Sequence, residues 1–168
     1  MSVRTSSGIQ WSGGGVGLKS IGILAQSGTP SGVTGTSAET ALATITVPAG
    51  TLGPHGRIVI ETLWSMTNNA DTKTAFIRIA GTAILGWGAT TSSVFRAKTE
   101  IRNAGSRTSQ VFPANGTPLA YSDGLNGSAY GTASIDFTTV QTISINGQVS
   151  VVTDTITLLG YTVQVTNP

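Results

Sequence analysis

The stretch SVFRAKTEIR, residues 93–102, decides the fold. Small and apolar side chains alternate in it with charged ones, which is the period of a β-strand with one buried and one solvated face. The set expected to face inward is Phe95, Ala97, Thr99 and Ile101, and the outward set is Arg96, Lys98, Glu100 and Arg102. This pattern predicts a strand of an antiparallel sheet that covers a hydrophobic core with one face.

Short stretches of the same kind, separated by turn residues, lie on both sides of residues 93–102. The other predicted strands span residues 41–47, 57–66, 73–85, 106–112, 133–145, 149–159 and 161–166. Asn68–Asp71 is expected to form a hairpin, the Asn146-Gly147 dipeptide a turn, and the change of apolar parity at Leu158–Gly160 a β-bulge. Because about eight strands alternate with turns, we predict an all-β, antiparallel two-sheet sandwich of jelly-roll-like type.

The composition agrees with strands and turns and limits the function classes. The 168 residues include 22 glycines and no cysteine, and only 10% are charged, with a net charge of +2. An ordinary soluble domain carries about 25% charged residues. So few charges argue against a protein that binds nucleic acid by neutralising phosphates. The absence of cysteine excludes disulfides, and no apolar run is long enough for a membrane helix, so we expect a soluble chain without membrane insertion.

The first 39 residues differ from the rest of the chain. Residues 1–26 mix apolar side chains with many glycines and are expected to form an N-terminal arm, residues 27–39 a Gly/Ser-rich linker or loop, and residues 40–168 the sandwich domain. Such an arm either packs on its own domain as an irregular first strand or docks on a partner. If it docks, the expected anchors are Ile9, Trp11, Val16, Leu18, Ile21 and Ile23.

Residue inventory argues against catalysis. The single histidine, His55, lies in a Gly-Pro-His-Gly turn, and no G-x-S-x-G nucleophile turn occurs. GGGVGLKS (13–20) imitates a phosphate-binding loop, but Leu18 stands where the motif requires glycine. We therefore expect no enzyme, no catalytic or metal-binding residues and no cofactor, and a small hydrolase is the least favoured alternative.

Two surface features are candidates for binding. The charged set Arg96, Lys98, Glu100 and Arg102 is either a solvated sheet face that protects against aggregation or a patch that contacts another subunit or a receptor. The turn-rich loop YSDGLNGSAY (121–130) combines aromatic rings with hydrogen-bonding groups that suit a sugar. Its expected glycan contacts are Tyr121, Asp123, Asn126 and Tyr130.

Residues 25–86 resemble small structural proteins of tailed-bacteriophage virions. The similar features are the run S-A-E-T-x-L-A-T-I-T-V-P-A-G-x-L-G-P-x-G-R and the following L-W-S-x-T-N-N and K-T-x-x-x-R-I-x-G-T patterns. The chain has no coiled-coil or β-helical shaft, so any fibre it forms is short.

The resemblance implies a compact sandwich that forms a homotrimer and attaches to the particle through an N-terminal arm. It implies location in the virion, after synthesis in the host cytoplasm, as a capsid decoration, head fibre or fibre knob. The partners are then the chain itself and capsid or other virion proteins, while the alternative is a host-recognition adhesin that binds a surface glycan.

Overall fold

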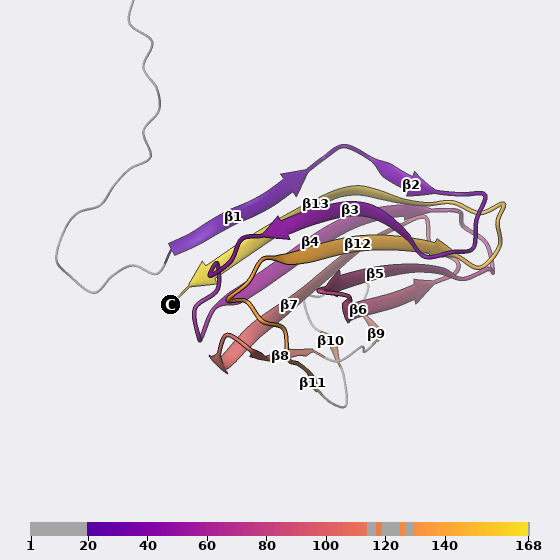
Figure 1. The fold of residues 1–168 in the computed structure, drawn as a ribbon. Helices are drawn as coiled ribbons and strands as arrows, with labels where there is room; N and C mark the ends of the chain where they lie inside the picture. Colours follow the sequence, from indigo (N-terminus) through magenta and orange to yellow (C-terminus); the bar gives the residue numbers. More distant parts are fainter. Residues whose placement is uncertain (1–19, 114–116, 119–124, 127–129, 168) are drawn as a thin grey trace, which may run out of the picture.

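The fold is an antiparallel sandwich of two β-sheets, in a computed structural model that describes residues 20–113, 117–118, 125–126 and 130–167 (Figure 1). The described residues contain no helix. The two sheets enclose one hydrophobic core, which draws on strands from both. The all-β two-sheet sandwich predicted from the sequence is confirmed.

The larger sheet has seven strands, in the order β1-β13-β4-β7-β8-β11, with β2 also paired to β13. Every pairing is antiparallel. The strands are β1 (Ser20–Ser27), β2 (Ser31–Val33), β4 (Arg57–Met66), β7 (Val94–Ser106), β8 (Ser109–Pro113), β11 (Tyr130–Ala133) and β13 (Ile156–Asn167).

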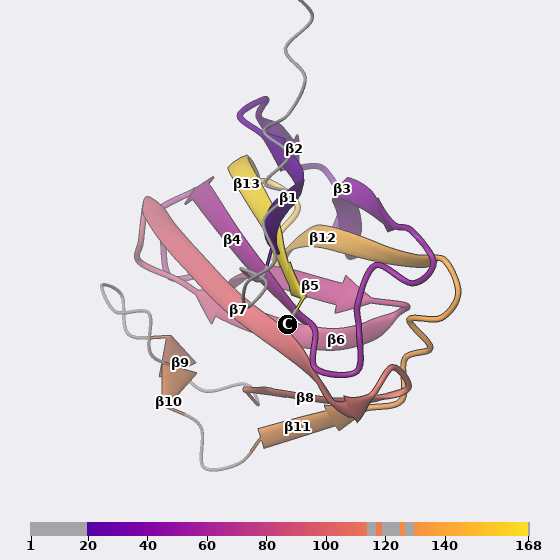
Figure 2. The same ribbon diagram turned by 90° about the vertical axis from the view of Figure 1, so that its left-hand side faces the viewer.

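The smaller sheet has four strands in the order β3-β12-β5-β6 and packs against one face of the larger sheet (Figure 2). A separate two-stranded ladder joins β9 to β10. These strands are β3 (Thr40–Val47), β5 (Lys73–Ile79), β6 (Thr82–Ala89), β9 (Thr117–Pro118), β10 (Leu125–Asn126) and β12 (Gln141–Val149). The described residues thus form thirteen strands, more than the eight expected. β1, β2 and the short β9–β11 were not predicted, and the strand expected at 73–85 is divided into β5 and β6. The two strands expected at 149–159 and 161–166 are instead the single strand β13, and the strand expected at 133–145 begins only at Gln141, as β12.

Strand β7 shows how the larger sheet covers the core with one of its faces. Phe95, Ala97, Thr99 and Ile101 are buried, whereas the charged residues between them are exposed or half-buried. Phe95 stacks on the fully buried Trp64 of β4, with ring centroids 5.8 Å apart. The indole Nε1 donates a 2.8 Å hydrogen bond to Thr62 Oγ1, which satisfies its polar group inside the core.

Two of the predicted turns are wrong, and one tight turn was missed. β4 and β5 belong to different sheets, so Asn68–Asp71 lies in a crossing between sheets and not in a hairpin. Asn146-Gly147 lies inside β12, where the register against β3 shifts. The tight hairpin is at Ala80-Gly81, between β5 and β6, where both residues have positive φ.

The predicted bulge in the C-terminal strand is confirmed. The register of β13 against β4 shifts between Leu158 and Gly160. The bulge allows a single strand to continue although the apolar residues change from even to odd positions there. The last part of the expected arm, residues 20–26, lies in β1, which pairs with β13 from Ser20–Asn167 to Ser27–Tyr161. Part of the expected linker forms β2. Residues 1–19 lie outside the described residues.

Candidate functional site

The candidate site is the outer face of the seven-stranded sheet, defined as the side that points away from the core. Strand alternation places Arg96, Lys98, Glu100 and Arg102 of β7 on this face, as predicted from the sequence. The neighbouring strand β4 adds Arg57 and Glu61, which stand opposite Arg102 and Lys98 in the register. Cross-strand register is not visible in a sequence, so these two partners were not predicted.

The charges of the outer face pair with one another across β4 and β7. The Glu61 carboxylate forms ion pairs with Arg96 and Lys98, with N···O distances of 3.0 and 3.3 Å. The Glu100 carboxylate forms ion pairs with Arg102 and Arg57, with N···O distances of 2.5 and 3.4 Å. Four cations thus share two carboxylates. These six residues, Arg57, Glu61, Arg96, Lys98, Glu100 and Arg102, are called the charge ladder, or the ladder, below, and they carry an excess of positive charge. Exposed pairs of this kind contribute only about 0–1 kcal/mol each, so they mainly fix the charge pattern that a partner would meet.

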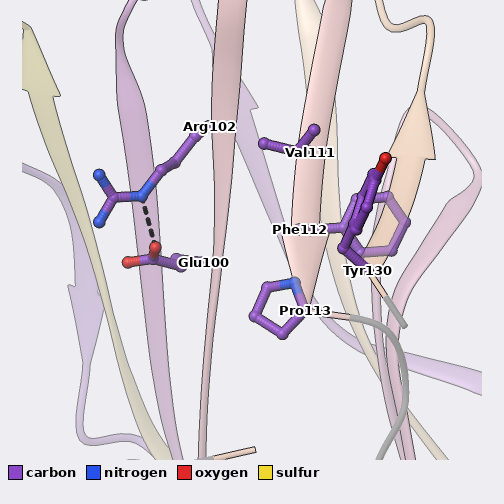
Figure 3. A pocket seen from close by; sticks show the side chains of 6 residues that line it. All are labelled: Glu100, Arg102, Val111, Phe112, Pro113 and Tyr130. Atoms are coloured by element: carbon purple, nitrogen blue, oxygen red, sulfur yellow. Dashed lines mark hydrogen bonds and ion pairs between the residues drawn. The ribbon is translucent and has the colours of Figure 1, made fainter. Parts of the chain in front are cut away.

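A shallow depression of about 470 Å³ lies beside the ladder, between β7, β8 and β11 (Figure 3). Its apolar floor and wall come from Val111, Phe112 and Pro113, and Tyr130 stands at the far side with 73% of its surface exposed. Figure 3 shows the ion pair of Glu100 and Arg102 on the opposite side from Tyr130. The site therefore presents an apolar, aromatic surface next to a charged hydrogen-bonding pair.

Gly131 allows the aromatic wall of this depression. It stands opposite Phe112 in the pairing of β11 with β8, and a Cβ atom added there would come within 2.3 Å of Phe112 Cε2. The Phe112 ring therefore lies directly over the glycine backbone, a place that any other residue would fill.

A second depression, of about 290 Å³, lies at the β13 bulge on the other side of the ladder. It is lined by residues of four strands, namely Ser27, Glu61, Thr62, Leu63, Arg96, Gly160, Tyr161 and Thr162. A Cβ atom at Gly160 would come within 2.9 Å of the Ser27 carbonyl oxygen, so the missing side chain lets β1 approach β13 closely at this point. The second depression therefore joins β1 and β13 to the charged residues of β4 and β7.

The β1 end of the outer face is apolar. Ile21 and Ile23 keep 67% and 53% of their surfaces exposed, and they stand opposite Thr166 and Gln164 of β13. β1 contains no charged residue and no proline, and no other described strand pairs with its second edge. Of the expected docking anchors, Ile9, Trp11, Val16 and Leu18 lie outside the described residues.

The expected glycan contacts are only partly described. Tyr130 lies at the depression beside the ladder, and Asn126 belongs to β10. Tyr121 and Asp123 lie outside the described residues. The apolar residues Val111, Phe112 and Pro113 were not predicted as part of a site. The sequence does not reveal that β8 pairs with β11, and this pairing places Pro113 opposite Tyr130.

Metal sites and membrane spans were searched over the described part of the chain. No group of three or more His, Asp or Glu side chains is placed there to hold a metal ion. No helix in that part is long and apolar enough to cross a membrane. His55 is exposed in its turn, as predicted.

Solved structures similar to this chain include two at low sequence identity. No family model and no curated protein sequence matches the chain. The CBM2 module of the evolved Dit of Lactobacillus casei BL23 phage J-1 is 11% identical, with a TM-score of 0.39 over 74% of this chain and 69% of that one. The structure of infectious bursal disease virus, Gx strain, is also 11% identical, with a TM-score of 0.28 over 89% of this chain and 40% of that one.

Proposed function

We propose that the chain is a non-enzymatic structural protein of a bacteriophage virion, which assembles as a homotrimer and attaches to the particle through its N-terminal segment. The resemblance of residues 25–86 to small virion proteins suggests this class. The role is a capsid decoration or head fibre, located in the virion.

The observation that carries the proposal is the second edge of β1, which pairs with no other strand in the described part of the chain. Natural sheets protect their edges with charges, prolines or short strands, because an unprotected edge pairs with other chains. β1 has eight residues, no charged residue and no proline, and Ile21 and Ile23 are exposed on it. The only irregularity of its pairing with β13 is one register shift between Ile23 and Ala25. An edge of this kind suits pairing or packing against a second subunit.

The low charge content supports the same role. Charged residues are depleted in the cores of subunit interfaces, because their desolvation is costly. Only 10% of this chain is charged, and four of its nine lysines and arginines lie in the ladder of the outer face. The edge at β1 therefore offers an uncharged surface, while the ladder fixes orientation.

Light scattering on the purified protein tests the assembly. We expect a mass three times the 17.1 kDa of one chain. The double variant Ile21→Lys/Ile23→Lys should have the mass of a single chain, because lysines on an open edge oppose pairing.

The matched control places the same lysines elsewhere. Val151 and Val152 are 37% and 49% exposed in the turn between β12 and β13, so Val151→Lys/Val152→Lys should leave the mass at three chains. A single-chain mass for the wild type at micromolar concentration would contradict the proposal. Loss of assembly in both variants would contradict the role of β1.

A second candidate function is supported by Tyr130. The nonpolar face of a sugar ring packs on an exposed aromatic ring, and sugar hydroxyls bind charged groups such as those of Glu100 and Arg102. A fibre knob that binds a host glycan would use the depression around Tyr130, and in this candidate Tyr121, Asp123 and Asn126 of the preceding loop add contacts.

A glycan array and a pair of variants test this second function. Tyr130→Ala should abolish binding of any sugar found on the array, whereas Tyr130→Phe should retain most of it, because the ring remains. Absence of binding at millimolar sugar, or equal loss in the two variants, would count against stacking on Tyr130.

A further inference from the structure

A partly buried cluster of polar side chains lies where the crossing from β4 to β5 meets the start of β13. Lys73, the first residue of β5, has no exposed surface, and Asp154 is only 2% exposed. Asn69 and Asp71 belong to the crossing itself. None of these groups lies on the outer face, so the proposed function does not account for them.

The contacts within the cluster are specific. Lys73 Nζ donates hydrogen bonds to Asn69 Oδ1 and, at 2.6 Å, to the Asp71 carbonyl oxygen. Asn69 Nδ2 donates to Asp154 Oδ1 at 2.8 Å. The backbone N–H of Asp71 donates to Asn69 Oδ1 at 3.0 Å. The side-chain amide of Asn69 is thus held between an amine and a carboxyl group.

One atom of the cluster lacks a hydrogen bond. Asp154 Oδ2 is buried and has no hydrogen-bond partner among the residues that the structure describes, and Lys73 Nζ lies 3.6 Å from it, beyond hydrogen-bond distance. A buried ammonium and a buried carboxylate are costly unless their pairing is close and every group is satisfied. The arrangement therefore calls for an explanation beyond a structural ion pair.

We propose that Lys73 and Asn69 form an intramolecular isopeptide bond, with Asp154 as the proton-transfer group. The inference is independent of the proposed assembly and glycan binding. It rests on three contacts of the Asn69 side chain. The Lys73 amine lies against its carbonyl oxygen, the Asp154 carboxyl group accepts a hydrogen bond from its amide nitrogen, and the Asp71 backbone N–H donates to its carbonyl oxygen.

The reaction balances within the cluster and releases ammonia. Asp154 takes a proton from the Lys73 ammonium, and the neutral amine attacks Asn69 Cγ to form a C–N bond. The Asp71 N–H stabilises the negative charge that develops on Oδ1. Asp154 then passes a proton to Nδ2 and takes back one from the attacking nitrogen, the Cγ–Nδ2 bond breaks, and NH₃ leaves. The products are a secondary amide and a protonated Asp154.

The geometry selects Asn69 over Asp154 as the residue that is attacked. Lys73 Nζ touches the Asn69 carbonyl oxygen, whereas its separation from Asp154 Oδ2 is 3.6 Å. The Asp154 carboxyl group, which already accepts a hydrogen bond from Asn69 Nδ2, helps this nitrogen to leave as ammonia. Attack on Asp154 would release water and would leave Asn69 without a role.

The products also fit their burial better than the starting groups. Two buried charges become a neutral amide and a neutral acid, which removes the cost of keeping an ion pair out of water. The ring contains only five residues, 69–73, so its effect on chain entropy is small. Its main effect is to fix the crossing between the two sheets.

Mass spectrometry of the purified wild-type protein tests the proposal. We expect an intact mass lower than that of the sequence by one ammonia. Trypsin cleaves after lysine only when the side-chain amine is free, so residues 58–78 should appear as one peptide, uncut after Lys73 and lighter by one ammonia.

Three variants fix the assignment. Lys73→Met should show the full mass of its sequence. Asn69→Asp should lose water and reach the same mass as the cross-linked wild type, because both give the same amide. Asn68→Ala, at the exposed neighbour, should still lose ammonia.

Three results would overturn the proposal. They are a wild-type mass equal to that of the sequence, loss of water from the wild type, and loss of ammonia with normal cleavage after Lys73. The last of these would indicate succinimide formation at an asparagine, which leaves the lysine free.

Discussion

Glu39 shows how one side chain ties together the smaller sheet. It lies just before β3 and receives Arg78 of β5 through two hydrogen bonds of 2.7 Å, from Nε and Nη2. Asn146 Nδ2 of β12 donates a third, at 2.5 Å. This explains why Asn146-Gly147 forms no turn: the amide is held by Glu39, and a Cβ at Gly147 would meet Ile156 Cγ2 at 2.9 Å inside the core.

The stability of the protein should depend on the charge of Glu39. Hydrogen bonds from Arg78 lower the pKa of Glu39 from its ordinary value of 4.5, against the opposing effect of burial. Because the pKa of Glu39 is lower in the folded state than in the unfolded state, its carboxylate stabilises the folded protein. This contribution is fully present at pH values above the unfolded-state pKa. It is lost as the pH falls through the folded-state pKa. At neutral pH, Glu39→Gln should therefore lower the free energy of unfolding by about 1 kcal/mol.

Urea unfolding at a series of pH values checks this prediction. The difference between wild type and Glu39→Gln should shrink as pH falls below 4.5 and should vanish only below the lowered folded-state pKa, because the wild-type carboxyl group is protonated first in the unfolded chain and only later in the folded one. A difference that stays constant over this range would contradict a role for the carboxylate charge.

The hairpin between β5 and β6 depends on an unusual residue. Ala80 has a φ of 50° and Gly81 a φ of 78°, the left-handed conformation that tight hairpins require at both central positions. Glycine adopts it without cost, but alanine is strained there by about 1–2 kcal/mol. The Ala80 N–H also bonds to the Thr142 carbonyl of β12 at 2.9 Å, so the turn is held in place by its neighbour.

Ala80→Asn should stabilise the protein by about 0.5–1 kcal/mol, because asparagine tolerates this conformation and Asn-Gly is the preferred pair for such turns. Thermal or urea unfolding measures the change. The matched control is Ala83→Asn in β6, an exposed position without positive φ, where asparagine should be neutral or destabilising. Equal effects of the two substitutions would contradict relief of strain at Ala80.

The sequence predicts which residues form strands better than it predicts which strands pair with one another. The alternation in residues 93–102 is local, so both faces of β7 were predicted correctly. The sheet to which a strand belongs depends on distant pairing, so Asn68–Asp71 was taken for a hairpin although β4 and β5 lie in different sheets. For the same reason, Glu61 was missed as a partner of the charged residues of β7, and Phe112 was missed as part of the lining of the depression beside Tyr130. Arg96 was predicted as part of the charged set, and Tyr130 as a glycan contact.

At the scale of the whole molecule, the described chain begins and ends at one end of the seven-stranded sheet. Ser20 pairs with Asn167, and β1 follows β13 to Ser27 (Figure 1). β1 therefore belongs to the fold, and an experiment on the N-terminal segment must leave it intact.

A truncation that removes residues 2–18 should fold with an unchanged unfolding temperature, because the pairing of β1 with β13 begins at Ser20. Under the proposed function, this protein should assemble but no longer join virions, as measured by protein content of purified particles. Removal of residues 2–27 is the control; it also takes away β1 and should lower the unfolding temperature. Full incorporation of the shorter truncation would contradict docking through Ile9, Trp11, Val16 and Leu18.

The shared end of β1 and β13 has a practical consequence for protein engineering. A peptide fused after residue 168 would emerge beside the segment proposed to attach to the particle, and would face its surface. The turn around Val151 and Val152 lies at the opposite end of β13, where both side chains are exposed. Exposed turns tolerate insertions. If the N-terminal segment faces the particle, foreign epitopes inserted in this turn would be displayed outward.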